Sequence, residues 1–226
     1  MKRFNYYKLT GVLPAAVVFL MFMASQNTAA QPVSAPFSED FNSGSLPAGW
    51  TNTSSSTSTN ALWKFTGNPN GGASNANNGK TSGDYAWGDA SFPEQPDVTL
   101  TTPLIDVTAL NVPMLSFEWF SNNTTNPGDN TTLLVEVNNG SGWTNVGTFA
   151  GDDPNWVQED IILAPYANDT IQVRFIHDQT TTTSSAFYND MLLDDVSVDE
   201  APTCFPVDSI QTVAKTSNSI DLDWVD

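Results

Sequence analysis

Apolar and polar residues alternate along most of the chain between Pro36 and Glu200, and no stretch there has helical periodicity. In residues 170–178, for example, three apolar side chains alternate with Gln172 and Arg174. An alternation of period two places successive side chains on opposite faces, as in a β-strand that covers a core with one face. The pattern therefore predicts strands and argues against a helical domain.

Turn signals divide this pattern into short strands. Asn138-Asn139-Gly140 is a strong hairpin signal, and residues 52–60 and 68–83 are rich in Ser, Thr, Asn and Gly, which predicts long exposed loops. Strands are expected at residues 37–41, 62–65, 85–87, 98–107, 113–121, 131–138, 142–149, 156–163, 170–178 and 191–198. About ten short strands predict an all-β fold, an antiparallel β-sandwich of the jelly-roll kind.

The first 30 residues have the order of a secretory signal peptide. Lys2, Arg3 and Lys8 precede an apolar run from Gly11 to Met23, and small residues end the segment at Ala30. The run is shorter than the roughly 20 residues that span a membrane, so we expect cleavage after Ala30. The mature chain is then secreted or held at the cell surface, without membrane insertion.

The remaining chain divides into three parts. Residues 31–35 are expected to be a linker, and residues 36–200 a single domain that ends at Glu200-Ala201-Pro202. A new alternating pattern begins near Cys204 and runs to the last residue, Asp226. About 26 residues are too few to enclose a core of their own, so residues 201–226 are expected to be the start of a truncated second domain.

The formal charge of −18 limits the partners of the chain. Removal of residues 1–30 takes away three of the seven basic residues and none of the 25 acidic ones, which leaves −21. Such a surface repels nucleic acids and attracts cations. We therefore expect no nucleic-acid partner.

Few catalytic mechanisms are open to this composition. The chain has one histidine, His177, and one cysteine, Cys204, and it lacks the glycine motifs that bind nucleotide phosphates. The cysteine lies outside the main predicted domain and no Gly-x-Ser-x-Gly motif marks a serine nucleophile, so no Cys-His or Ser-His-Asp hydrolase is indicated. One His and one Cys cannot form a zinc site with several His or Cys ligands. A glycosidase pair of carboxylates is not marked by any motif. We predict that this region is not an enzyme, and that His177 lies at the surface or rim.

Strand parity predicts two inward carboxylates. Asp194 shares the parity of Val196 and Val198, and Glu39 shares that of Phe37 and Phe41. A buried carboxylate is costly unless it is paired or bound to a metal ion.

Two kinds of partner remain open for these carboxylates. One is a salt bridge or other hydrogen bond, with Arg174 as the candidate cation. The other is a structural Ca²⁺ ion, to which Glu39, Asp40, Asp194 and Asp195 would supply oxygen ligands. The expectation fails altogether if the parity assignment is wrong.

Seven tryptophans suggest carbohydrate binding, because sugars stack on exposed aromatic faces. Most are expected to be buried, Trp119 in the core and Trp50 as a cap on the sandwich. Trp143 and Trp156 lie near turns and are the candidates for ligand binding.

Three short motifs resemble those of MAM-like and cleaved-adhesin jelly-roll domains. They are Phe37-Ser38-Glu39-Asp40-Phe41-Asn42 with Leu46-Pro47-Ala48-Gly49-Trp50, then Leu100-Thr101-Thr102-Pro103 with Leu115-Ser116-Phe117-Glu118-Trp119, and finally Leu192-Leu193-Asp194-Asp195-Val196. The resemblance spans the whole predicted domain. Carbohydrate-binding jelly rolls share the same ends, so the resemblance specifies the fold better than the ligand.

The resemblance implies an extracellular adhesion or recognition module of a bacterial type, because the paired cysteines of animal MAM domains are absent. It also implies a structural cation bound by an acidic residue of the first strand and one of the closing pair. These positions correspond to Glu39 or Asp40 and to Asp194 or Asp195. The tail, with Ile220-Asp221-Leu222-Asp223-Trp224, resembles the beginning of a fibronectin type III domain.

The sequence thus predicts a secreted, non-catalytic adhesion or recognition module with a structural calcium ion, within a larger modular protein. The alternative is a carbohydrate-binding module of a secreted multidomain hydrolase. The expected partner is an extracellular protein or a glycan.

Overall fold

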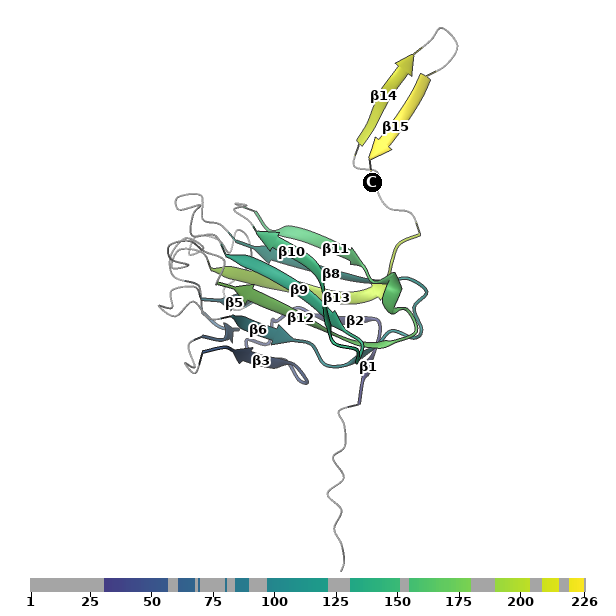
Figure 1. Ribbon diagram of the computed structural model, residues 1–226. Coiled ribbons are helices and arrows are strands. Elements are labelled where there is room, and N and C mark those ends of the chain that lie inside the picture. The colour runs from purple at the N-terminus through teal and green to yellow at the C-terminus, as the bar shows by residue number, and fades with distance from the viewer. Residues whose placement is uncertain are drawn as a thin grey trace, which may run out of the picture.

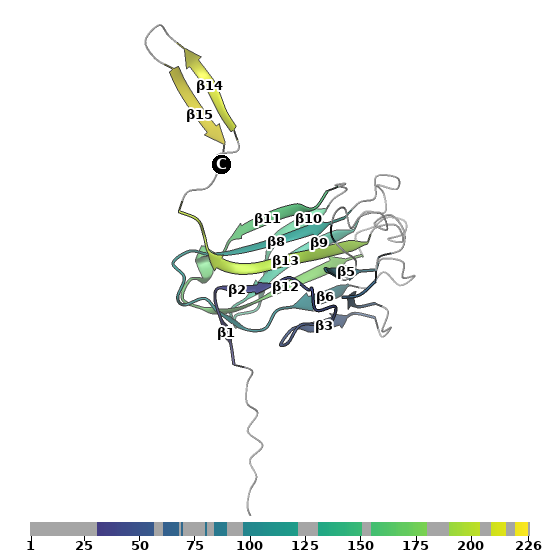
Figure 2. The same ribbon diagram turned by 180° about the vertical axis from the view of Figure 1, so that it is seen from behind.

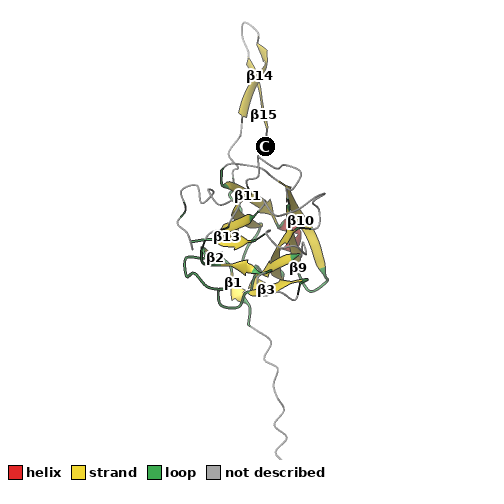
Figure 3. Cartoon of the chain, turned by 90° about the vertical axis from the view of Figure 1, so that its left-hand side faces the viewer, coloured by secondary structure: helices red, strands yellow, loops and turns green. Residues whose placement is uncertain are grey.

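The computed structural model describes residues 31–56, 61–67, 69, 80, 84–89, 97–121, 131–150, 155–179 and 190–203, and the strands of a C-terminal hairpin. Two β-sheets pack face to face, and Figure 3 shows them as two layers (Figures 1 and 3). The all-β sandwich predicted by the alternating pattern is confirmed. In these residues the helical structure is one 3₁₀ turn, η3, at Ala164–Tyr166.

The first sheet has seven strands. Its members are β1 (Val33–Ser34), β3 (Thr51–Ser54), β6 (Val98–Thr101), β7 (Ile105–Asp106), β9 (Thr132–Asn138), β10 (Trp143–Ala150) and β12 (Thr170–Asp178). Its long strand β12 pairs with β9 on one side and with β6 and β7 on the other. β10 and β9 form the hairpin expected at Asn139-Gly140.

The second sheet has six strands. Its members are β2 (Phe37–Glu39), β4 (Trp63–Lys64), β5 (Ala86–Gly88), β8 (Pro113–Phe120), β11 (Val157–Ile162) and β13 (Met191–Glu200). β13 runs through its middle, where it pairs with β8 on one side and with β5 and β2 on the other (Figure 2).

The main core fills the space between the two sheets. Leu115, Phe117 and Trp119 of β8 meet Val173 and Phe175 of β12, and all five are buried, as their alternation predicted. The ring of Phe117 packs edge-on against that of Phe175, with centroids 5.2 Å apart.

A second, smaller apolar cluster lies on the outer face of the six-stranded sheet. It consists of Tyr85, Trp87, Phe120 and Leu192, with Trp156 packed against it. Strands β5, β8 and β13 therefore bury apolar residues on both of their faces near this cluster. The outer face of this sheet is not exposed to solvent throughout.

Two short strands were not predicted. Residues 52–54 lie within the stretch expected to be a loop, but together with Thr51 they form β3, an edge strand paired with β6. The side chain of Asn52 joins β3 to β4 of the other sheet, because its amide N–H donates to the carbonyl of Trp63 and its oxygen accepts from the N–H of Trp63. The other is β1, which lies within the expected linker and pairs in parallel with β7.

The C-terminal strands β14 (Ser209–Lys215) and β15 (Ile220–Val225) pair with each other. The fibronectin type III resemblance and the domain boundaries stay predictions. The signal-peptide prediction for residues 1–30 and the remarks on Cys204 fall outside the described residues.

Candidate functional site

A bulge in β13 changes the face on which Asp194 lies. Asp194 and Ser197 are three residues apart on β13, but their partners on β8, Glu118 and Ser116, are only two residues apart. The extra residue lies between Asp194 and Ser197, where Asp195 has a left-handed φ of 49°. It shifts the alternation of side chains between the two faces. Val196 and Val198 face the main core, whereas Asp194 faces the outer cluster. The parity prediction for Asp194 was therefore wrong about the face, although the residue is 4% exposed.

Lys80 is the partner of Asp194. Its Nζ lies 2.5 Å from Asp194 Oδ2, 2.6 Å from Glu118 Oε2 and 2.9 Å from Asp195 Oδ2. The ammonium also lies over the ring of Trp156, 4.7 Å from its centroid. We call Lys80, Glu118, Asp194, Asp195 and Trp156 the lysine cluster. It lies beside the outer apolar cluster, and Asp194 and Lys80 are its most buried charged members.

Burial and pairing act in opposite directions on the charges of the lysine cluster. Burial raises the pKa of Asp194 to about 6, although the hydrogen bond from Lys80 lowers it in part. Burial also tends to lower the pKa of Lys80, but hydrogen bonds to Asp194, Glu118 and Asp195 more than offset this, and its pKa rises. Lysine is thus held as an ammonium ion among three carboxyl groups.

The alternative partner, Arg174, is engaged elsewhere. Its Nε donates to Glu136 Oε2 at 2.5 Å, on the outer face of the seven-stranded sheet. The guanidinium also stacks on Trp143, 4.2 Å from the ring centroid. The prediction of an Arg174–Asp194 salt bridge was wrong, because the two side chains lie on different sheets.

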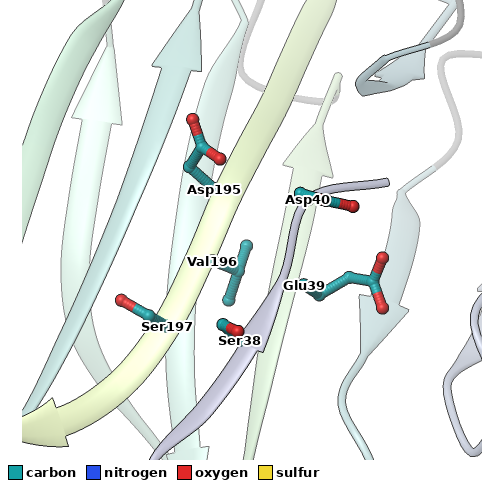
Figure 4. Close-up of a pocket in the computed structure, with 6 residues that line it drawn as sticks. All are labelled: Ser38, Glu39, Asp40, Asp195, Val196 and Ser197. Carbon is teal, nitrogen blue, oxygen red and sulfur yellow. The ribbon is translucent and has the colours of Figure 1, made fainter. Parts of the chain in front are cut away.

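The other acidic candidates lie around the edge of β2. Glu39, Asp40 and Asp195 line a hollow of about 380 Å³ with Ser38 and Ser197 (Figure 4). These oxygens are of the hard type that Ca²⁺ prefers. In Figure 4, however, Asp195 points to one side of β13 while Glu39 and Asp40 point to the other side.

Glu39 is only half-buried, and its carboxylate accepts a hydrogen bond from the backbone of Phe41. Burial raises the pKa of Glu39, and the N–H of Phe41, which donates to its Oε1 at 2.9 Å, works against this rise. Within the described ranges, no group of three or more His, Cys, Asp or Glu side chains is placed to hold a metal ion. Calcium binding by Glu39, Asp40, Asp194 and Asp195 stays a prediction.

The two candidate tryptophans differ in what covers them. Trp156 is partly buried and packs against the outer cluster, with Tyr85 and Phe120 at centroid distances of 5.8 and 5.7 Å and Lys80 over its ring. Trp143 is partly exposed on the outer face of the seven-stranded sheet, where Arg174 stacks on it. The surroundings of Trp156 indicate a packing role, and Trp143 is the better candidate for a ligand.

His177 is fully buried, so the predicted surface or rim position was wrong. The register of β12 places it on the inner face after Phe175. Its Nε2 lies 2.8 Å from Thr131 Oγ1, and its ring packs near that of Trp63. The hydroxyl contact satisfies a ring nitrogen that would otherwise be costly to bury.

Sequence reasoning did not single out Lys80 or Glu118. Glu118 occupies a regular outward position on β8, which gives it no special mark. Lys80 lies 114 positions from Asp194 and outside any predicted strand. The available signal was the small number of basic residues that could pair with a buried carboxylate, because only four follow position 30. Three of them, Lys64, Lys80 and Arg174, each lie over a tryptophan ring and contact a carboxylate.

Comparison with known proteins gives a likeness of structure. No family model and no curated protein matches the sequence. The K1 cleaved adhesin domain of Lys-gingipain from Porphyromonas gingivalis W83 is 22% identical, with a TM-score of 0.53 over 74% of this chain and 99% of that chain. For the K3 domain of the same protein the identity is 21% and the TM-score 0.52, over 73% of this chain and 98% of that chain.

A carbohydrate-binding module, TmCBM61 in complex with β-1,4-galactotriose, is more distant, at 11% identity and a TM-score of 0.48 over 72% of this chain and 94% of that chain. Among the described residues, no helix is long and apolar enough to cross a membrane. The predicted MAM resemblance stays a prediction. The comparisons confirm that the chain has the β-sandwich fold found in cleaved adhesin domains.

Proposed function

We propose that this chain is a non-catalytic extracellular recognition module that binds a glycan on the outer face of its seven-stranded sheet, around Trp143, and contributes to adhesion through this binding. The observation that carries the proposal is the strand register. One cross-strand row contains Trp143, Asn138 and Gln172, and the next contains Asn145, Glu136 and Arg174.

This arrangement combines the two kinds of contact that sugars require. An indole ring offers an apolar face for the C–H face of a pyranose, and the amide, carboxylate and guanidinium groups around it offer planar hydrogen-bond partners for hydroxyls. Arg174, held by Glu136, covers one face of Trp143 and so fixes the ring orientation. A ring that is already fixed loses little conformational entropy on binding. The fold shared with cleaved adhesin domains supports a non-catalytic module.

Replacement of Trp143 by alanine is expected to weaken glycan binding at least about tenfold, because a central aromatic contact typically contributes 1.4 kcal/mol or more. Affinity electrophoresis and a glycan array, both with the full chain, would measure this. Trp156→Ala is the matched control, since it removes an indole that packs beside Tyr85 and Phe120. It should lower stability and leave affinity unchanged. Binding that survives Trp143→Ala, or no binding to any glycan, would reject the proposal.

The proposed module also includes a structural Ca²⁺ ion, for which Glu39 and Asp40 at the edge of β2 are the candidate ligands, because Asp194 and Asp195 both contact Lys80. With Ca²⁺ at about 100 times its dissociation constant, the free energy of unfolding is expected to rise by about 2.7 kcal/mol over a chelated sample. Thermal melting in chelator, Ca²⁺ and Mg²⁺ would test this. Asp40→Asn should abolish the rise, and Asp199→Asn, an exposed acidic position on the neighbouring strand β13, should keep it. Identical melting curves with and without Ca²⁺ would contradict it.

A further inference from the structure

The lysine cluster brings an amine and a carboxyl group into contact in a shielded place. Lys80 Nζ lies 2.5 Å from Asp194 Oδ2, an oxygen bonded directly to the carboxyl carbon Cγ. The side chains of Lys80 and Asp194 are 19% and 6% exposed. Reacting groups held in contact in this way have effective concentrations of about 10⁵–10⁸ M, which is enough for reactions that free molecules in water do not complete.

The surroundings provide a group that can move protons. Glu118 is the cross-strand partner of Asp194, and its Oε2 lies 2.6 Å from the same Nζ. Trp156 covers the ammonium, and Leu192 and Phe120 lie on the same outer face of the sheet. Asp195 also contacts Nζ, but its side chain is 56% exposed and therefore in contact with water. Asp194 is the carboxyl group from which water is best excluded.

We propose that Lys80 and Asp194 condense into an intramolecular amide bond, with Glu118 as the proton carrier. The carboxyl groups favour the ammonium form of Lys80, so the reaction proceeds from the minor neutral pair, in which one ammonium proton has passed from Nζ to the carboxylate of Asp194 to give an amine and a carboxylic acid. The nitrogen attacks Cγ of Asp194, and Glu118 accepts a second proton from the nitrogen. Glu118 returns this proton to a hydroxyl of the tetrahedral intermediate, which leaves as water.

The products are one amide and one water molecule, so atoms and charge balance and no oxidant or other reactant is required. The bond joins residue 80 to the central strand of the six-stranded sheet. The apolar neighbours that promote the reaction by excluding water also protect the amide from hydrolysis.

Mass spectrometry of the full chain, after it has been purified in the folded state, tests the proposal. The mass is expected to be lower by one water, about 18 Da, than the mass calculated from the same N-terminus and sequence. Proteolysis should yield one branched peptide that contains both Lys80 and Asp194. In Lys80→Arg and Asp194→Ala the mass deficit should disappear. Glu118→Ala retains both reacting groups but lacks the proton carrier, so it should remain largely unlinked.

Lys64 and Asp89 provide an internal control. Lys64 Nζ lies 2.7 Å from Asp89 Oδ2 and 4.4 Å from the ring centroid of Trp87. In the described part of the chain, Lys64 forms an ion pair with a single carboxylate, so this pair lacks a counterpart of Glu118. These two residues should be recovered in separate, unmodified peptides. Wild-type protein of full calculated mass, with Lys80 and Asp194 in separate peptides, would overturn the proposal. A variant that fails to fold would not affect this result, because the decisive measurement is on the wild type.

Discussion

Replacement of Phe117 by alanine is expected to lower the free energy of unfolding by about 3–5 kcal/mol, the range for removal of a buried phenylalanine. The side chain is 1% exposed, and its ring lies edge-on to Phe149 and Phe175, with centroids 5.6 and 5.2 Å away. Both partners belong to the opposite sheet. The substitution therefore opens a cavity between the two layers and removes two aromatic contacts across it.

Chemical denaturation would measure this loss. An unchanged slope of the free energy of unfolding against denaturant concentration would show that the mutant still unfolds in one step. Ser116→Ala is the matched control, because the neighbouring position on β8 points away from the core. It should change the stability by no more than about 0.5 kcal/mol. A loss below about 1 kcal/mol for Phe117→Ala would show that Phe117 does not hold the sheets together as described.

Replacement of Gly88 by alanine is expected to cost about 1–3 kcal/mol through overpacking. A Cβ atom at this position would lie 2.6 Å from Nδ1 of His177, closer than atoms can approach without movement. The histidine has little room to move, since it is fully buried and in contact with Thr131. Gly88 thus makes space for a side chain of the opposite sheet.

A double-mutant cycle isolates this steric effect. His177→Ala alone leaves a cavity and should also destabilise the protein. If the Cβ of residue 88 acts by meeting the imidazole ring, Gly88→Ala should cost much less in the His177→Ala background, with a coupling of about 1 kcal/mol or more. Simple additivity of the two substitutions would contradict a direct clash.

The long strands could be predicted from the sequence because burial of one face leaves a clear pattern. β12 begins and ends where the alternation does, at Thr170 and Asp178, and the β9–β10 hairpin turns at Asn139-Gly140. Edge strand β3 escaped prediction because Thr, Asn and Ser also compose loops, and because its partner β6 lies more than 40 residues away.

The candidate site was less predictable, since one residue in β13 decides which face Asp194 occupies. Asp195 adopts a left-handed conformation that glycine usually marks, so nothing in the sequence announced the bulge. Simple alternation therefore correctly indicated a buried carboxylate at Asp194 but assigned it the wrong surroundings. The contact between Lys80 and Asp194 follows from tertiary packing alone.

The position of β13 in the middle of its sheet determines the order in which the sandwich can form. This strand is the last of the sandwich in the chain, yet β8, β5 and β2 all pair with it. Until residues 191–200 have been synthesised, the edges of these strands that face β13 lack a partner. The domain therefore cannot fold piecemeal from its N-terminus, and the long loops to be closed make its folding slow. Mutual repulsion of the many acidic side chains opposes the association of such incomplete chains through their open edges.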